Sequence, residues 1–129
     1  MLSEFVKSAD WKSEKHVPVI ECADTAKAGE PLAITISVGK EIAHPNTTNH
    51  HIAWIALHYV PAGAKASIEI TRCEFSSHGA AVEGPDKGPA YTCSTVSVSA
   101  KLAASGTLYA TAYCNIHGLW ASEKQVTVA

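Results

Sequence analysis

The chain is dominated by stretches in which apolar residues alternate with small or polar ones. The clearest stretch is 32–38, where Leu32, Ile34, Ile36 and Val38 alternate with small or hydroxyl residues. Successive side chains of a strand point to opposite faces, so this period of two predicts strands with one buried face. No segment of ten residues keeps a helical period. Similar alternation is found at 68–72, 95–99, 107–112 and 126–128.

The stretch from Ile52 to Val60 is apolar on both faces apart from His58, which predicts a more deeply buried strand. Turn-forming residues at 27–31, 61–63, 84–89 and 105–106 separate the strand patterns. Short strands divided in this way predict an all-β fold, an immunoglobulin-like sandwich of about seven strands. A length of 129 residues without repeats or linkers predicts a single domain over 1–129.

The charge of the chain limits its partners. The formal net charge is −2, and the lysines and arginines form no block. This argues against nucleic acid and against an anionic membrane surface as partners. The first residues lack the basic start and apolar run of a signal peptide, and no run approaches the ~20 apolar residues of a membrane span. We therefore expect a cytoplasmic protein with reduced thiols.

Four cysteines occur singly, with no C-x-x-C pair, which argues against a four-cysteine iron or zinc site. We expect Cys22, Cys73 and Cys93 to be small buried hydrophobic residues. The sequence leaves open whether any of them forms a disulfide. Cys114 differs from the other three because it belongs to a Cys-x-x-His motif.

Seven histidines are present, against one methionine, and most of them fall in three short segments. These segments are 14–18, 44–52 and 114–120, and each lies where a strand pattern starts or stops. Loops from distant parts of a sandwich gather at one end of the fold, so the three segments can converge on one ion. Such an excess of histidine indicates a metal site.

The donor types indicate which ion would bind. Imidazole suits iron, copper, zinc and nickel, whereas a thiolate favours softer or redox-active ions. Four imidazoles and one thiolate exceed the usual four ligands of zinc and leave one open position on a six-coordinate ion. In the Cys114-x-x-His117 loop, amide groups can turn toward the sulfur, and Gly118 permits a tight turn.

The remaining aromatic and histidine residues have ordinary interpretations. We expect His51, His58 and His78 to be polar residues without a metal, and Trp11, Trp54 and Trp120 to belong to the core or an interface. Two other classes of protein fit parts of the pattern. A cupredoxin, an electron carrier, has a late Cys-x-x-His loop but commonly a Met after its second His, and none follows His117. The third interpretation is a structural zinc domain.

Three motifs together resemble one known family. E-K-H-V-P at 14–18, H-P-N-T-T-x-H-H-I at 44–52 and C-N-I-H-G-L-W at 114–120 are similar to superoxide reductase of the neelaredoxin type. The resemblance runs from Trp11 to the end of the chain. It implies an immunoglobulin-like sandwich with a square-pyramidal iron site. The implied equatorial ligands are His16, His44, His50 and His117, and the implied axial ligand is Cys114; His51 is not a ligand in the family.

The resemblance also implies an activity, the one-electron reduction of superoxide to hydrogen peroxide with an external electron donor. The implied donor is rubredoxin-like and the implied assembly is a homotetramer. Two residues are implied to be catalytic: Lys15 would steer the anion, and Glu14 would bind the open position of the ferric ion. The chain departs from the family pattern at Asn49, usually Glu, and at Ala43, often Pro. It lacks the four cysteines of the extra N-terminal iron module, and so resembles the one-iron form.

Overall fold

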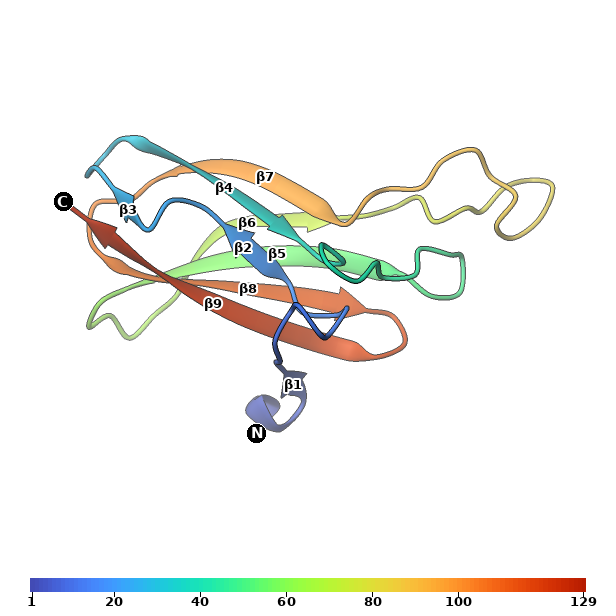
Figure 1. Ribbon diagram of the computed structural model, residues 1–129, viewed down its shortest axis with the longest axis horizontal. Helices are drawn as coiled ribbons and strands as arrows, with labels where there is room; N and C mark the ends of the chain where they lie inside the picture. The colour runs from blue at the N-terminus through green and yellow to red at the C-terminus, as the bar shows by residue number, and fades with distance from the viewer.

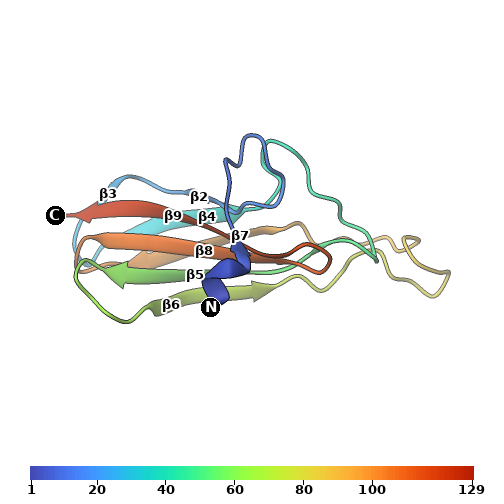
Figure 2. The ribbon, with the colours of Figure 1, turned by 90° about the horizontal axis from the view of Figure 1, so that it is seen from below.

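The computed structural model describes residues 1–129, and its strands form two facing sheets (Figures 1 and 2). The elements in chain order are the 3₁₀ turn η1 (Leu2–Glu4), β1 (Val6–Lys7), β2 (Val19–Glu21), β3 (Thr25–Ala26), β4 (Pro31–Ser37), β5 (Ile52–Pro61), β6 (Ile68–Glu74), β7 (Thr95–Lys101), β8 (Gly106–Cys114) and β9 (Gly118–Val128). The larger sheet has the order β1-β9-β8-β5-β6, with β3 also paired to β9, and the smaller has the order β2-β4-β7.

The predicted sandwich is confirmed. Seven strands have three or more residues, and β1 and β3 are two-residue additions to the edge of β9. The long strands pair antiparallel, whereas β1 and β3 run parallel to β9. No helix of the structure has the length and apolar character needed to cross a membrane.

The core lies between the sheets, and the alternating residues fill it. From β4 and the residue after it, Leu32, Ile34, Ile36 and Val38 point inward and are 0–7% exposed. The predicted deep burial of β5 is also confirmed, because Ile55, Ala56 and Leu57 are at most 1% exposed in succession. From β8, the inward-facing residues are Leu108, Ala110, Ala112 and Cys114, all fully buried.

Two expectations about burial are wrong. Ile68 follows the alternation of β6, yet it is 53% exposed, because β6 is the edge strand of the larger sheet. Cys93 is exposed in the loop before β7, and Cys22 and Cys73 are only partly buried. All four cysteines are free thiols, so no disulfide is present.

Strand register brings the three histidine segments to one end of the sandwich. Ile52, the first residue of β5, pairs with Cys114, the last residue of β8, and Cys114 pairs with Gly118 at the start of β9. In the smaller sheet, Val19 pairs with Ser37, so the segment before β2 and the loop after β4 also lie together. The loops after β4, β6 and β8 leave at the same end, to the right in Figure 1.

Candidate metal centre

Four imidazole rings form a near-square at this end of the sandwich. The ring centroids of His16 and His44 are 4.8 Å apart, those of His44 and His50 4.9 Å, those of His50 and His117 5.0 Å, and those of His117 and His16 4.8 Å. The diagonal from His16 to His50 is 6.5 Å, close to the diagonal of a square with those sides. The four rings come from three separate segments, as the sequence predicted.

Cys114 supplies the sulfur of the site. Its thiol is fully buried, and its Sγ lies 3.7 Å from Nδ1 of His117. The ligand atoms of His16, His50, Cys114 and His117 all lie within 4.8 Å of one another, a spacing that suits one ion. The backbone N–H of His117 donates to the sulfur at 3.3 Å, as expected for this loop, and such a bond stabilises a thiolate.

His44 lies at the edge of this group, and its ring carries a lone pair that no protein atom uses. Its Nδ1–H donates to the carbonyl of Pro45 at 2.7 Å, which leaves Nε2 as the unprotonated nitrogen. Nε2 of His44 and Nε2 of His50 are both buried without a hydrogen-bond partner. Buried polar atoms are rarely left unpaired. Two such nitrogens beside a thiol fit a bound metal ion.

The protonation state of these rings favours metal binding. Burial lowers the pKa of His44 to about 4, with a smaller lowering by the nearby charge of Lys15. Burial likewise lowers the pKa of His50. Both rings are therefore neutral at pH 7 and offer lone pairs to an ion.

His16 is fixed from two sides. Its Nδ1–H donates to Oε1 of Glu14 at 2.6 Å, and the same oxygen accepts the backbone N–H of His16 at 3.1 Å. The bond from His16 lowers the pKa of the Glu14 carboxyl, against the smaller opposing effect of burial. The Nε2 atom of His16 is left facing the cluster, 3.1 Å from Nδ1 of His117. Glu14 thus lies behind the ring and outside the cluster in this structure.

Trp120 covers the face of His16. The two rings are stacked at 4.9 Å with an interplanar angle of 14°, and the indole N–H donates to the carbonyl of His117 at 3.3 Å. Lys7 of β1 lies over the indole, 5.7 Å from its centroid. Trp120 is a core residue, as the sequence predicted, but it also orients two of the candidate ligands.

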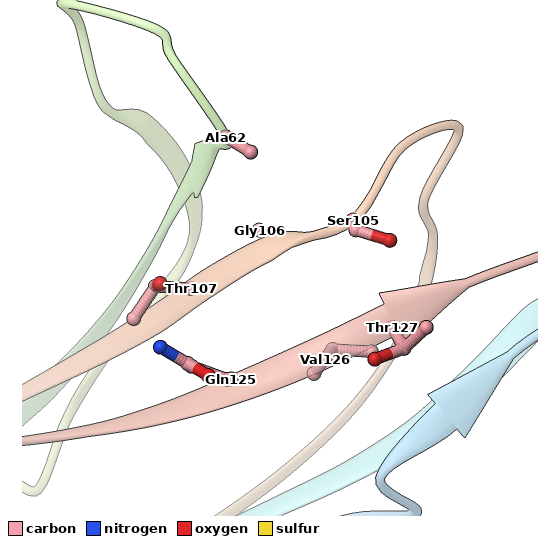
Figure 3. A pocket seen from close by; sticks show the side chains of 7 residues that line it. All are labelled: Ala62, Ser105, Gly106, Thr107, Gln125, Val126 and Thr127. Carbon is pink, nitrogen blue, oxygen red and sulfur yellow. The ribbon is translucent and has the colours of Figure 1, made fainter.

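Two hollows on the surface differ in chemistry. A cavity of about 330 Å³ lies beside the cluster and is lined by Ser13, Glu14, Lys15, His16 and Ile42. Another, of about 240 Å³, lies at the opposite end of the sandwich (Figure 3). Its lining contains no histidine, cysteine or acidic residue: it consists of Ala62, Ser105, Gly106, Thr107, Gln125, Val126 and Thr127. Only the first cavity places an ionisable surface next to the metal ligands.

Asn115 joins two of the ligand loops, a role that the sequence analysis missed. Its Oδ1 accepts the backbone N–H of His51 at 2.9 Å, and its Nδ2 donates to the carbonyl of Asn49 at 2.9 Å. A backbone bond from Asn115 to His51 adds a third link, at 3.2 Å. Its place inside the Cys-x-x-His motif was the only signal in the sequence.

The other histidines lie outside the square. His58 faces outward on β5, 3.7 Å from the carboxylate of Glu69. His51 donates from Nδ1 to the carbonyl of Thr47 at 2.8 Å, and its ring stacks on that of His78 at 3.6 Å. These three rings therefore lie outside the cluster of candidate donor atoms.

Fold and donor set together define a class: a β-sandwich protein with a mononuclear metal centre of imidazole and thiolate ligands. The pattern of the desulfoferrodoxin family matches residues 8–123. The chain belongs to the desulfoferrodoxin family.

Relatives match along almost the full length of the chain. Neelaredoxin of Megalodesulfovibrio gigas is 49% identical over 98% of this chain and 98% of its own. The superoxide reductase of Pyrococcus furiosus is 47% identical over 95% of this chain and 97% of its own.

Solved structures agree with this assignment. A structure from Thermotoga maritima superposes with a TM-score of 0.98 at 50% identity, covering 100% of this chain and 98% of the other. The superoxide reductase (neelaredoxin) of Archaeoglobus fulgidus in its reduced form gives a TM-score of 0.88 at 49% identity, covering 95% of this chain and 98% of the other.

Proposed function

We propose that this chain is an oxidoreductase that reduces superoxide to hydrogen peroxide at one iron ion. The observation that carries the proposal is the near-square of four imidazoles beside a buried thiol, with two buried Nε2 atoms that no protein group satisfies. Relatives at about half identity over nearly the whole chain bear the name superoxide reductase, which supports the same activity.

In this proposal His16, His44, His50 and His117 would hold the ion through their imidazole nitrogens, and Cys114 would hold it through its sulfur. The chemistry that bound ferrous iron supplies there is the transfer of one electron to superoxide, which with two protons yields hydrogen peroxide. The chain's own contribution is to keep the imidazoles neutral by burial and to hold the sulfur with the N–H of His117. A fixed donor set of this kind lowers the reorganisation that the reaction requires.

Lys15 is the proposed steering residue. It lies on the wall of the cavity beside His16, and its positive charge acts on both His44 and His50. Superoxide is a small anion, so a cation at the entrance raises the rate of encounter without tight binding of the product.

The substitution Lys15→Ile tests this role. We expect the encounter rate at low ionic strength to fall by about tenfold, because the attraction that steers the anion is removed. The salt dependence of the rate should weaken as well. The measurement is the rate of superoxide decay after a pulse, and Lys27→Ile, the same change of charge in the turn before β4, is the control. An unchanged rate at low salt would remove steering from the proposal.

Glu14 is the second proposed catalytic residue. To serve as a ligand of ferric iron, its carboxylate would have to leave both the ring and the backbone N–H of His16. Its hydrogen bond to the ring also gives it a role in the resting protein, because an imidazole that donates to a carboxylate is oriented and made more basic.

For Glu14→Ala we expect iron retention to fall by about tenfold, because His16 loses the acceptor that orients it. The encounter rate per bound iron should change far less than in Lys15→Ile. Iron retained against a chelator measures the first effect, and Glu14→Gln, which keeps an oxygen acceptor, should restore most of it. A large drop in the encounter rate per iron would contradict the division of roles between the two residues.

We propose that the electron comes from outside the chain, as the family resemblance implies. We propose a rubredoxin-like protein as the donor, a homotetramer as the assembly and the cytoplasm as the location. These three proposals rest on the family resemblance.

The decisive experiment combines metal analysis with product stoichiometry. The purified protein should contain one iron per chain, whereas a cupredoxin would contain copper and a structural domain zinc. With a limiting supply of electrons, superoxide reduction yields one peroxide per electron supplied, whereas dismutation yields peroxide without electron supply. Peroxide formation that is independent of added electrons would overturn the proposed reaction.

A further inference from the structure

The segment that joins β6 to β7, residues 75–94, is long for a connection in a compact sandwich. It contains only two isolated bridges, His78 with Tyr91 and Ala81 with Gly84. Its ordered contacts with the rest of the chain concentrate on the loop 44–51, which carries His44 and His50. In Figure 1 the segment is the yellow to orange excursion that leaves at the same end as the green loop before β5.

Asp86 is the first anchor of the segment. Its Oδ1 accepts the backbone N–H of Thr48 at 2.7 Å and lies 3.1 Å from the Thr48 hydroxyl. The Asp86 backbone N–H donates to the same hydroxyl at 3.2 Å. Asp86 is the one residue other than glycine with a positive φ, 58°. A strained backbone of this kind persists where surrounding contacts fix it, and here those contacts are with Thr48.

His78 and Asn46 form the second anchor. Asn46 donates from Nδ2 to the carbonyl of Thr92 at 2.9 Å, which leaves its Oδ1 facing Nδ1 of His78 at 2.8 Å. The other ring nitrogen of His78 lies 2.6 Å from the carbonyl of Phe75. The ring also stacks on His51 at 3.6 Å with an interplanar angle of 3°.

The anchored residues lie between and directly beside the candidate ligands of the loop. Asn46 lies two residues after His44, Thr48 lies two residues before His50, and His51 follows His50 directly. Inside the loop itself, the bonds are those of His44 with Pro45, of Thr47 with His50 and of Thr47 with His51. The loop has no strand pairing of its own, so its shape depends on bonds from elsewhere.

We propose that the segment 75–94 positions the metal loop, with Asp86 and His78 as the positioning residues that keep His44 and His50 in the square. The inference rests on the proposed ligand set. Groups behind metal ligands commonly change metal affinity by about 10–100-fold when they are removed. The segment thus contributes to the site although none of its residues is a ligand.

The test uses Co²⁺ as the probe metal, added to metal-free protein in competition with a chelator. Asp86→Gly removes the carboxylate but tolerates the positive φ, and we expect the affinity for Co²⁺ to fall by about tenfold. Asp86→Asn also tolerates positive φ and keeps an oxygen acceptor, so it should restore most of the affinity. Glu83→Gln, an exposed acid in the same segment, is the matched control and should bind as the parent does.

Two further readouts separate positioning from general stability. The absorption bands of the Co²⁺ form should shift in Asp86→Gly, and the amide of Thr48 in the metal-free protein should exchange faster with deuterium. His78→Phe tests the second anchor independently, because it keeps a ring against His51 and loses both nitrogen contacts. It also keeps the proposal testable if Asp86→Gly does not fold.

The inference would be overturned if a folded anchor variant, Asp86→Gly or His78→Phe, kept both the Co²⁺ affinity and the absorption bands of the parent. A lower Tm in that variant would not rescue the inference. His50→Ala in the same assay separates this failure from a failure of the ligand set. If His50→Ala binds Co²⁺ as the parent does, the ligand set is wrong. If His50→Ala loses binding while both anchor variants keep it, only the positioning role is wrong.

Discussion

The two loops that carry or adjoin most of the candidate ligands are held in place by different kinds of contact. The loop 115–117 is a short hairpin between β8 and β9, and Cys114 is the last residue of a strand paired on both sides. The loop 38–51 crosses from the smaller sheet to the larger and has no strand partner. The first loop is placed by sheet register, and the second is placed by side chains of Asn115, His78 and Asp86.

This difference predicts which amino-acid substitutions the metal centre tolerates. Register is set cooperatively by many backbone bonds, so single substitutions outside Cys114 and His117 should leave the hairpin in place. The crossing loop depends on a few individual bonds, and each of them is open to loss by one substitution. The candidate ligands therefore differ in what holds them in place. Sheet register holds Cys114 and His117, whereas a few side-chain bonds hold His44 and His50.

The largest effect is expected at the hairpin ligand itself. In Cys114→Ser the sulfur is replaced by a hydroxyl, a weak ligand that stays protonated, and iron affinity should fall by more than about a hundredfold, beyond the range seen for groups behind the ligands. The thiolate charge-transfer band should vanish from the absorption spectrum, because no sulfur remains. Cys93→Ser, at an exposed cysteine, is the control and should change neither quantity.

A smaller effect is expected where the two loops are joined. Asn115→Ala removes both side-chain bonds to the crossing loop, and we expect metal affinity to fall by about tenfold. Amide exchange should rise in 46–51 and change little in β8 and β9. Asn49→Ala is the control, because only the backbone carbonyl of Asn49 takes part. Equal exchange gains in both loops would mean that the hairpin is no better secured than the crossing loop.

The smallest effect is expected from pH in the metal-free protein. The pKa of His44 is lowered to about 4 and that of His50 is also lowered, whereas in the unfolded chain both rings titrate near 6.5. Between these values the unfolded chain binds more protons than the folded one, so stability falls as pH drops from about 6.5 to about 4. Amide exchange should show 44–51 opening first, and His44→Gln should flatten the response. Hairpin opening at the same pH would contradict the distinction between the loops.

Much of the fold was predictable, because the alternation of apolar and polar residues in each strand is a local pattern of the sequence. The alternation at 32–38 and at 107–112 gave the inner faces of β4 and β8 correctly, since each inward residue is buried. The same pattern failed at Ile68, because an alternating sequence does not reveal that its strand lies at the edge of a sheet. Edge position depends on the order of strands, which is a property of the whole chain.

The clustering of the candidate ligands was also predictable, because their motifs place donor atoms in short segments at strand ends. The structure brings the four histidines and Cys114 together as expected. The groups behind them were not predictable, because Asp86 lies outside the three motifs and is 38 residues from Thr48, the residue that it contacts. The position of Glu14 behind His16, and not over the cluster, required the geometry of the ring.

The span of the site along the chain has a consequence for how the protein is made. The first candidate ligand is His16 and the last is His117, so the square cannot close until the chain has been synthesised beyond His117. Cys114 takes its place when β8 has paired both with β9, its hairpin neighbour, and with β5, which is distant in sequence, and pairing between distant strands slows folding. A growing chain therefore offers isolated histidines and no assembled site. The complete set of five candidate ligands is therefore gathered only in the folded chain.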